Sequence, residues 1–348
     1  MISDQTYKKH KALILQAIDL AGGLLTNNQQ IIPLLKRIKE LSGYSNQSLG
    51  ELITYARKEN GINKNLHPKS AGKFTERPEP ETIFPQYENV NHYFEDFEEG
   101  WYKIRKPYVL PAKDMKIGVL SDIHIANHVR PAVMIALQEI KSKGCDTIIL
   151  NGDTLDCESL GFWRHRPDKN LFRMEVDHAL NFFTGLRKMF PKEKIIFKQG
   201  NHEERVQHTI IDKNPELYGM ISIEEILKLK EFGIESVEEK QIIKCGELNI
   251  IHGHEVRMSF GAVNLARTMF LKTQVNILFG HFHTAQEYIS TNLDRHSHGA
   301  WAVGCLCDLS PDYNPYANNW AHGFAIVEKK ASGMFTVSNK KIINGTIL

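Results

Sequence analysis

The chain has 348 residues, of which 42% are hydrophobic and 24% are charged, and its formal net charge is +2. This length allows one large domain or two ordinary ones, and the composition excludes a disordered or collagen-like chain. A charge so close to zero points to no particular partner for the chain as a whole.

The cysteines and the N-terminal residues indicate in which cellular compartment the protein is expected. The five cysteines are odd in number and lack finger-like spacing, which indicates reduced thiols. The first residues show no basic segment followed by an apolar one, so no signal peptide is expected. No apolar run approaches the roughly 18 residues of a membrane helix. We therefore expect a cytoplasmic protein with no membrane contact.

Residues 1–62 have the pattern of a helical domain. Apolar side chains recur at helical spacing over residues 13–21, 31–41 and 49–56, and Lys and Arg outnumber the acids. Three short helices with a basic excess are typical of helix-turn-helix domains, which bind nucleic acid. The alternative is a small bundle whose lysines form a solvated face or which packs on the main domain.

Residues 63–113 are predicted to connect this domain to the next. Residues 63–86 carry four prolines and little apolar content, which is typical of a linker. Residues 87–101 mix acidic and aromatic side chains, and we expect them to dock on the main domain through the aromatic rings. The third segment then spans residues 114–348.

The pattern changes to alternating strands and helices from about residue 115. Apolar runs predict strands at 116–120, 147–150 and 194–197, with helices over 131–143 and 171–189 between them. This alternation indicates βαβ units and a largely parallel sheet. Beyond residue 236 strands dominate, apart from a helix over 263–271, which suggests a second sheet packed on the first. These strands are expected at 239–245, 248–252, 275–279, 286–290, 300–304, 323–328 and 333–338.

Five polar clusters each follow a strand-like run. The carboxyl ends of strands in open α/β sheets are where ligands bind. The clusters offer carboxylate, imidazole and amide groups but no thiol, which suits ions such as Mn, Fe, Zn or Ni. They are sufficient for two ions that share one carboxylate. The clusters are Asp122-Ile123-His124, Gly152-Asp153, Gly200-Asn201-His202-Glu203, His252-Gly253-His254 and Gly280-His281-Phe282-His283.

These five blocks, in this order, resemble those of the calcineurin-like metallophosphoesterase superfamily over about residues 115–330. The resemblance implies an α/β fold, a four-layer sandwich of two mixed β-sheets flanked by helices. In this chain the sandwich would follow an N-terminal all-α domain.

The resemblance also implies a ligand set for two divalent metal ions. Asp153 would bridge them, and His252 is preferred over His254, although the reverse assignment stays open. In the preferred assignment His254 is a phosphate contact or supports a ligand. Mn is the favoured metal, with Fe, Zn, Ni or Mg as alternatives. The first ion would bind Asp122, His124 and His283, and the second Asn201, His252 and His281.

The mechanism implied is hydrolysis of a phosphoester. A metal-bridging hydroxide attacks phosphorus in line, and His202 protonates the leaving oxygen as general acid. Alternatively, His202 only orients its loop. Asp156 could hydrogen-bond His202 or a ligand, and Arg205 could either contact the phosphate or lie exposed on a helix.

Two further stretches have open interpretations. Residues 162–166 alternate aromatic and basic side chains, which suits stacking on a nucleotide or single-stranded nucleic acid. Tyr313, Tyr316 and Trp320 could wall the cleft. Either stretch could instead be packed surface.

The details separate this chain from some members of the superfamily. Cys157 and Glu158 stand where phosphoprotein phosphatases carry an arginine and a glycine, which argues against that activity. The Gly-Asn-His-Glu-Glu-Arg run and Gly323-Phe324 are similar to phage and prophage phosphoesterases, and repair nucleases share the metal site. We predict a phosphodiesterase or nuclease acting on DNA or a nucleotide. The alternatives are a phosphomonoesterase or nucleotide phosphatase, and a non-catalytic scaffold, against which the intact ligand set argues.

Overall fold

The computed structural model describes residues 4–20, 28–59, 105–161, 172–258, 263–316 and 318–348. The chain divides into two compact units, Met1–Gly100 and Trp101–Leu348. Most of the expected linker and docking segment, residues 60–104, lies outside the described residues, as do residues 162–166.

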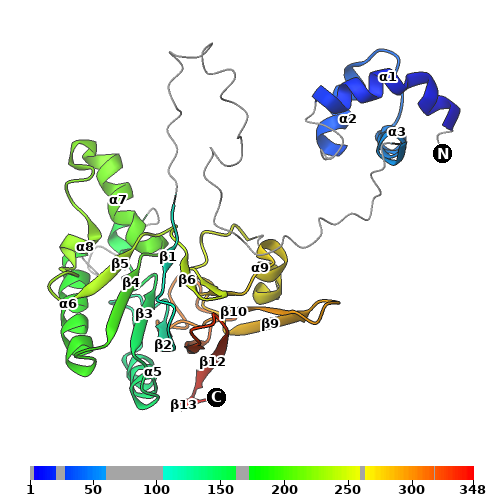
Figure 1. Cartoon of the computed structure of the whole chain (residues 1–348). Helices are drawn as coiled ribbons and strands as arrows, with labels where there is room; N and C mark the ends of the chain where they lie inside the picture. The colour runs from blue at the N-terminus through cyan, green and yellow to red at the C-terminus, as the bar shows by residue number, and fades with distance from the viewer. Residues whose placement is uncertain (1–3, 21–27, 60–104, 162–171, 259–262, 317) are drawn as a thin grey trace, which may run out of the picture. The chain divides into compact units, whose positions relative to one another are not determined.

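The N-terminal unit consists of α1 (Asp4–Leu20), α2 (Asn28–Arg37) and α3 (Asn46–Glu59) (Figure 1). Their apolar faces enclose a core that includes Ile14, Ile18, Leu35 and Leu52. Two lysines of the basic excess hold this unit together. Lys36 Nζ donates to the carbonyl oxygens of Ser42 and Tyr44, and Lys11 pairs with Glu59 at 2.7 Å.

The second unit contains a seven-stranded sheet in the order β13-β12-β11-β2-β3-β4-β5. Strands β2 to β5 are mutually parallel, whereas β11, β12 and β13 add antiparallel pairings, so the sheet is mixed. The bounds are β2 Met115–Leu120, β3 Thr147–Asn151, β4 Lys194–Lys198, β5 Ile234–Val237, β11 His322–Lys329, β12 Phe335–Ile343 and β13 Thr346–Ile347.

A six-stranded sheet has the order β1-β6-β7-β8-β10-β9 and is also mixed. Strand β1 belongs to the segment expected to be linker, and it pairs in parallel with β6. The bounds are β1 Tyr108–Val109, β6 Ile243–Cys245, β7 Leu248–Ile250, β8 Ile277–Phe279, β9 Gln286–Thr291 and β10 Ser297–Ala302.

Helices complete this unit. The longer ones are α5 Arg130–Ser142, α6 Phe172–Met189, α7 Asn201–Lys213 and α9 Leu265–Thr273. The short ones are η2 Glu158–Leu160, η3 Pro215–Leu217 and α8 Ile223–Ile226. Helix α5 begins with proline in its first turn, where the missing N–H costs no hydrogen bond.

Alternation along the strands produces four layers. Ile148 and Leu150 face a core shared with α5 and α6, whereas Ile149 faces a core between the two sheets. In the other sheet Leu278 joins the core between the sheets, and its neighbours Ile277 and Phe279 pack on α9. The order is therefore helices, sheet, sheet, helix (Figure 1), and the predicted fold is confirmed.

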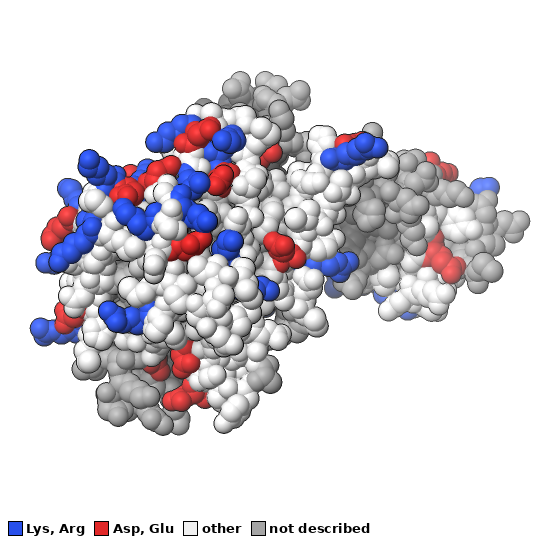
Figure 2. Space-filling model, turned by 90° about the horizontal axis from the view of Figure 1, so that it is seen from below, with Lys and Arg blue, Asp and Glu red and all other residues white. Residues whose placement is uncertain are grey.

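The face of the molecule shown in Figure 2 carries charges of both signs. Lys and Arg are interspersed there with Asp and Glu rather than gathered in one basic patch. Within the described ranges, no helix combines the length and the apolar character needed to cross a membrane.

Candidate metal centre

The five predicted clusters all lie at the carboxyl ends of strands. Those of Asp122, Asp153 and Asn201 follow β2, β3 and β4, which are adjacent parallel strands of one sheet. Those of His252 and His281 follow β7 and β8, which are adjacent and parallel in the other. The two sheets thus bring residues up to 161 positions apart to one rim.

The backbone at these strand ends is in an unusual conformation. Five residues with side chains have positive φ between 49° and 67°: Asp122, His124, Asp153, His281 and His283. Outside glycine this left-handed region costs roughly 1 kcal/mol or more per residue, and it concentrates at functional sites. The fold therefore tolerates local strain in order to aim these side chains at one point.

Two glycines of the motifs, Gly200 and Gly280, lie so close to carboxylates that a side chain would not fit. A Cβ on Gly200 would lie 2.2 Å from Asp153 Oδ1, and one on Gly280 would lie 2.4 Å from Asp122 Oδ2. Neither distance is possible between real atoms, so only glycine leaves room for these carboxylates.

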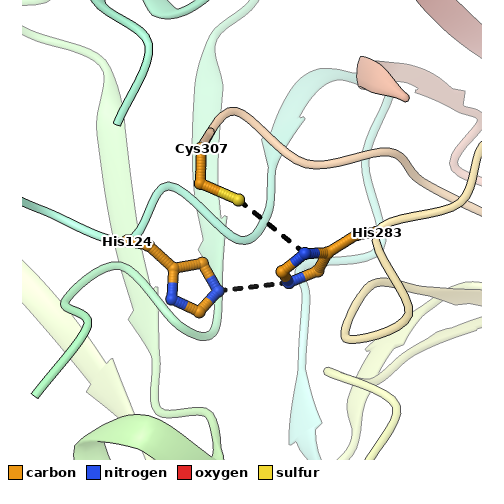
Figure 3. A group of neighbouring side chains, drawn as sticks. All are labelled: His124, His283 and Cys307. Carbon is orange, nitrogen blue, oxygen red and sulfur yellow. Dashed lines mark hydrogen bonds between the residues drawn. The ribbon is translucent and has the colours of Figure 1, made fainter. Parts of the chain in front are cut away.

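The first group of ligand atoms surrounds His283 Nε2. This nitrogen lies 3.2 Å from Asp122 Oδ1 and 3.2 Å from His124 Nε2. The other nitrogen of each imidazole is already bonded: His124 Nδ1 donates to Asp156 Oδ1 at 3.0 Å, and His283 Nδ1 lies 3.7 Å from Cys307 Sγ (Figure 3). The two Nε2 atoms therefore face each other and a carboxylate, and in neutral imidazoles they would direct lone pairs at an ion bound there.

A second group lies around Asp153. Its Oδ2 is 3.1 Å from His252 Nε2 and 3.9 Å from His124 Nε2. The potential ligand atoms of Asp153, His252 and His281 lie within 4.8 Å of one another, as do those of His124, Asp153 and His202. Asp153 thus belongs to both groups, which is the position expected for a bridging carboxylate.

Unpartnered polar atoms show that these residues fit metal ions. Asn201 Oδ1 is buried without a hydrogen-bond partner, and His252 Nε2 has only the Asp153 carboxylate beside it. Burying a polar atom unpaired costs about 1–3 kcal/mol. Neutral oxygen, imidazole nitrogen and carboxylate together form a donor set for borderline divalent ions. The residues present therefore fit a pair of such ions.

The charges of the centre support the same conclusion. Burial raises the pKa of Asp122, but His252 and His283 bring this pKa down to about 2. Burial lowers the pKa of His252, but Asp153 and Asp122 raise it to about 10. Burial also lowers the pKa of His283, but Asp122 raises it to about 10. Burial and the charge of His252 lower the pKa of His281 to about 4. The ionised carboxylates thus attract positive charge, which metal ions would supply in place of protons.

His202 and Arg205 lie beside these groups on the first turns of α7. His202 Nδ1 donates to the Asp156 carbonyl oxygen at 2.6 Å, and its Nε2 accepts from Arg205 Nη2 at 2.9 Å. Arg205 Nη1 donates to the Asp156 carbonyl oxygen as well. Arg205 is therefore at the centre, rather than on an exposed helix face. Asp156 contacts both His124 and His202.

The structure places His254 apart from the two groups. Its ring nitrogens make no hydrogen bond, although Nδ1 lies 3.5 Å from Glu255 Oε2, and its ring lies 5.4 Å from that of His252. Burial lowers the pKa of His254. A neutral imidazole at this distance can contact a phosphate bound between the groups.

Several supporting residues escaped the sequence analysis. Glu203 Oε2 accepts from the backbone N–H of Asp153 and of Gly200, and its Oε1 accepts from that of Leu155. Glu203 therefore ties the loop after β3 to the start of α7. Its place in the Gly-Asn-His-Glu motif was the available signal, because a buried acid beside two ligands needs donors.

A buried ion pair supports the His252 loop in the same way. Glu255 accepts from the backbone N–H of His252 and of Gly253, and Glu255 Oε1 lies 3.0 Å from Lys198 Nζ. Lys198 is fully buried on β4, where the sequence showed only a strand residue. Cys307 was missed because cysteine belonged to none of the five clusters.

Comparison with known proteins was informative at the level of the family. Residues 115–303, more than half of the chain, match the model of the calcineurin-like phosphoesterase superfamily domain. No match was found among curated protein sequences.

Solved structures with a similar fold include three from different organisms. Vps29 from Entamoeba histolytica with Zn²⁺ is 14% identical, covers 67% of this chain and 96% of its own, and has a TM-score of 0.35. Yfce, a phosphoesterase from E. coli, is 14% identical, with 64% and 98% covered and a TM-score of 0.31. A dimetal phosphatase from Danio rerio is 10% identical, with 66% and 96% covered and a TM-score of 0.31. Given the family match over residues 115–303, the chain belongs to the calcineurin-like phosphoesterase superfamily.

Proposed function

We propose that this protein is a phosphoester hydrolase that uses two divalent metal ions, Mn²⁺ foremost, and cleaves phosphodiesters as a nuclease or phosphodiesterase. The observation that carries the proposal is the pair of ligand groups sharing Asp153, with His202 beside them. When bound, two such ions make a water acidic enough to act as nucleophile and neutralise charge on the phosphoryl oxygens.

His202 is suited to deliver a proton to the leaving oxygen. Hydrogen bonds from Nδ1 to Asp156 fix the ring so that Nε2 faces the centre, 3.8 Å from Asp153 Oδ2. Nε2 is held by the Arg205 guanidinium in this structure. A substrate phosphate that draws Arg205 toward itself would leave Nε2 free to take up a proton from solvent and pass it to the leaving oxygen.

The charge around the phosphate site favours a diester. Arg205 is the cation beside His202, and backbone carbonyl oxygens already occupy part of its guanidinium. A diester carries one negative charge, whereas a monoester carries close to two at neutral pH. One partly engaged arginine next to the metal groups suits the smaller charge.

An activity panel tests the proposal. The Mn²⁺-loaded protein should hydrolyse bis-p-nitrophenyl phosphate faster than p-nitrophenyl phosphate and should cleave DNA. Asp153→Asn should lose bound metal and activity together, because one carboxylate serves both groups. Hydrolysis of the monoester alone would show that the protein is a phosphomonoesterase and contradict the proposal. Inactivity on every substrate with metals bound would indicate a scaffold.

We further propose that the N-terminal unit binds nucleic acid through exposed basic residues, which include Lys9, Arg37 and Lys39. Reversing these three charges in the full chain should weaken duplex binding and reduce its dependence on salt by about one counterion per lost contact. Lys228→Glu, at an exposed lysine of the other unit, is the control for a charge reversal outside this unit. If all variants bind duplex equally, the N-terminal unit is a small helical bundle whose lysines form a solvated face.

A further inference from the structure

Aromatic side chains from the connection between β10 and β11 reach the edge of the metal centre. The Trp320 ring lies 4.0 Å from the His283 ring, and the Tyr313 ring lies 6.1 Å from that of Trp320, centroid to centroid. Tyr313 is nevertheless 77% exposed. Packing in a core does not account for such a ring, because most of its surface still faces solvent.

Hydrogen bonds fix this connection in place. Asn318 Nδ2 donates to the carbonyl oxygens of Leu309 and Asn314, and Asn318 Oδ1 accepts from the backbone N–H of Trp320. The backbone N–H of Ala321 donates to the His283 carbonyl oxygen at 2.9 Å. At the other end Asp308 N–H donates to the Asn127 carbonyl oxygen, three residues after His124. The aromatic rings are thus held relative to both ligand histidines before any substrate binds.

The charges around Tyr313 are those of the same centre. Although most of the Tyr313 side chain faces solvent, desolvation of its hydroxyl by neighbouring residues raises the hydroxyl pKa, the charge of Asp156 raises it further, and Arg205 lowers it. Tyr313 therefore lies within electrostatic reach of the residues that bracket His202. Aromatic rings within electrostatic reach of a guanidinium match a ligand with an aromatic part next to an anionic part.

We propose that Tyr313 and Trp320 form a stacking platform for the base of a nucleotide whose phosphate lies at the metal centre. The substrate class is then a nucleoside phosphoester, supplied by a mononucleotide ester or by a single-stranded end. This inference rests on the proposed function of the centre. Stacking on aromatic side chains accepts every base and requires an unpaired one, so paired duplex is excluded from the platform.

Two esters with the same leaving group test the platform. The Mn²⁺-loaded full chain is assayed on thymidine 5′-(p-nitrophenyl phosphate) and on methyl p-nitrophenyl phosphate. The nucleoside ester should have a kcat/KM at least about tenfold higher, since base stacking is worth about that factor or more. Tyr313→Ala and Trp320→Ala should both reduce this ratio toward one, whereas Trp320→Phe should preserve most of it. Tyr218→Ala, an exposed tyrosine after η3, is the matched control and should leave the ratio unchanged.

A binding measurement without metal separates this inference from the proposed function. Thymidine 5′-monophosphate should quench tryptophan emission of the metal-free protein, and Trp320→Phe should abolish the quenching. If an oligothymidylate binds more tightly than thymidine 5′-monophosphate, the natural ligand is a single strand. If the two bind with equal affinity, the natural ligand is a mononucleotide.

The two assays give different results if the platform is wrong and if the hydrolase is wrong. A ratio near one in the unmodified protein, or an equal loss on both esters in Trp320→Ala and Tyr313→Ala, would overturn the platform and leave the hydrolase intact. Hydrolysis of neither ester would overturn the hydrolase. Quenching would then still decide whether the aromatic rings bind a base.

Discussion

Cys307 Sγ lies 3.7 Å from His283 Nδ1, on the opposite side of the imidazole from the nitrogen that faces Asp122 and His124 (Figure 3). Metal-binding histidines usually donate their second N–H to a carboxylate or a carbonyl oxygen. Two of the other three ligand histidines follow that rule, because His124 uses Asp156 and His252 uses the Asn151 carbonyl oxygen. A thiol takes this role for His283.

The first prediction concerns this contact. Cys307→Ala should lower Mn²⁺ affinity about 10–100-fold, because the His283 ring loses the partner that fixes its orientation and tautomer. Cys307→Ser keeps an acceptor and should restore most of the affinity. Calorimetric titration of the metal-free protein measures both. Unchanged affinity in Cys307→Ala would show that the thiol only fills space.

How far the sequence predicted the site can be judged from single residues. Asp122, Asp153 and Asn201 were found because each follows a strand-like run, and parallel strands bring their carboxyl ends to one rim. The conformation of those ends was not predictable, since Asp and His adopt positive φ more often than most residues but still only in a minority of cases. Cys307 and Trp320 come close to the centre through a long connection, and contacts of that kind follow from the fold rather than from a local pattern.

The fold shows a similar division. The alternation of strands and helices predicted the parallel strands, and the resemblance implied the four layers, but β5 was missed because Ile234-Glu235-Ser236-Val237 is short and half polar. Helix α7 was anticipated only as one possible position of Arg205, because its first residues are the ligand motif itself, where capping and chemistry use the same side chains.

The second prediction assigns the proton. His202→Ala should keep its metals, because His202 contributes no atom that only a metal can satisfy. Turnover should fall by about 10²–10⁴ on esters with poor leaving groups and by much less on p-nitrophenyl esters, which need no proton. A series of aryl methyl phosphates measures this dependence. An equal loss across the series would assign His202 to orientation of its loop instead.

The third prediction concerns the buried ion pair of Lys198 and Glu255. Lys198→Met should destabilise the fold by about 3–5 kcal/mol, because it leaves the Glu255 carboxylate buried without its cation. The free energy of unfolding in urea measures this. Lys116→Met is the control, since Lys116 forms a pair of similar length, 2.9 Å, with an exposed Glu328. That surface pair should contribute less than about 1 kcal/mol. Equal effects of the two substitutions would contradict a special role for burial.

The fourth prediction is a pH dependence located at Glu175. This side chain is buried on α6, where its Oε2 accepts from the Cys157 N–H at 2.6 Å and its Oε1 has no partner. Burial raises the pKa of Glu175 to about 7. The folded state therefore keeps a proton that the unfolded chain releases near pH 4.5, so this group makes the protein less stable as the pH rises from about 4.5 to 7.

Glu175→Gln removes that dependence while keeping an acceptor for Cys157. At pH 8 the free energy of unfolding of the variant should exceed that of the unmodified protein by about 3 kcal/mol, because each pKa unit corresponds to about 1.36 kcal/mol. Near pH 4.5 the two proteins should be equally stable. The difference between the two proteins isolates Glu175 from the histidines, which titrate in both. Asp177→Asn, an exposed acid of the same helix, controls for effects on the helix. A gain of the same size at both pH values would mean that packing, rather than ionisation, accounts for it.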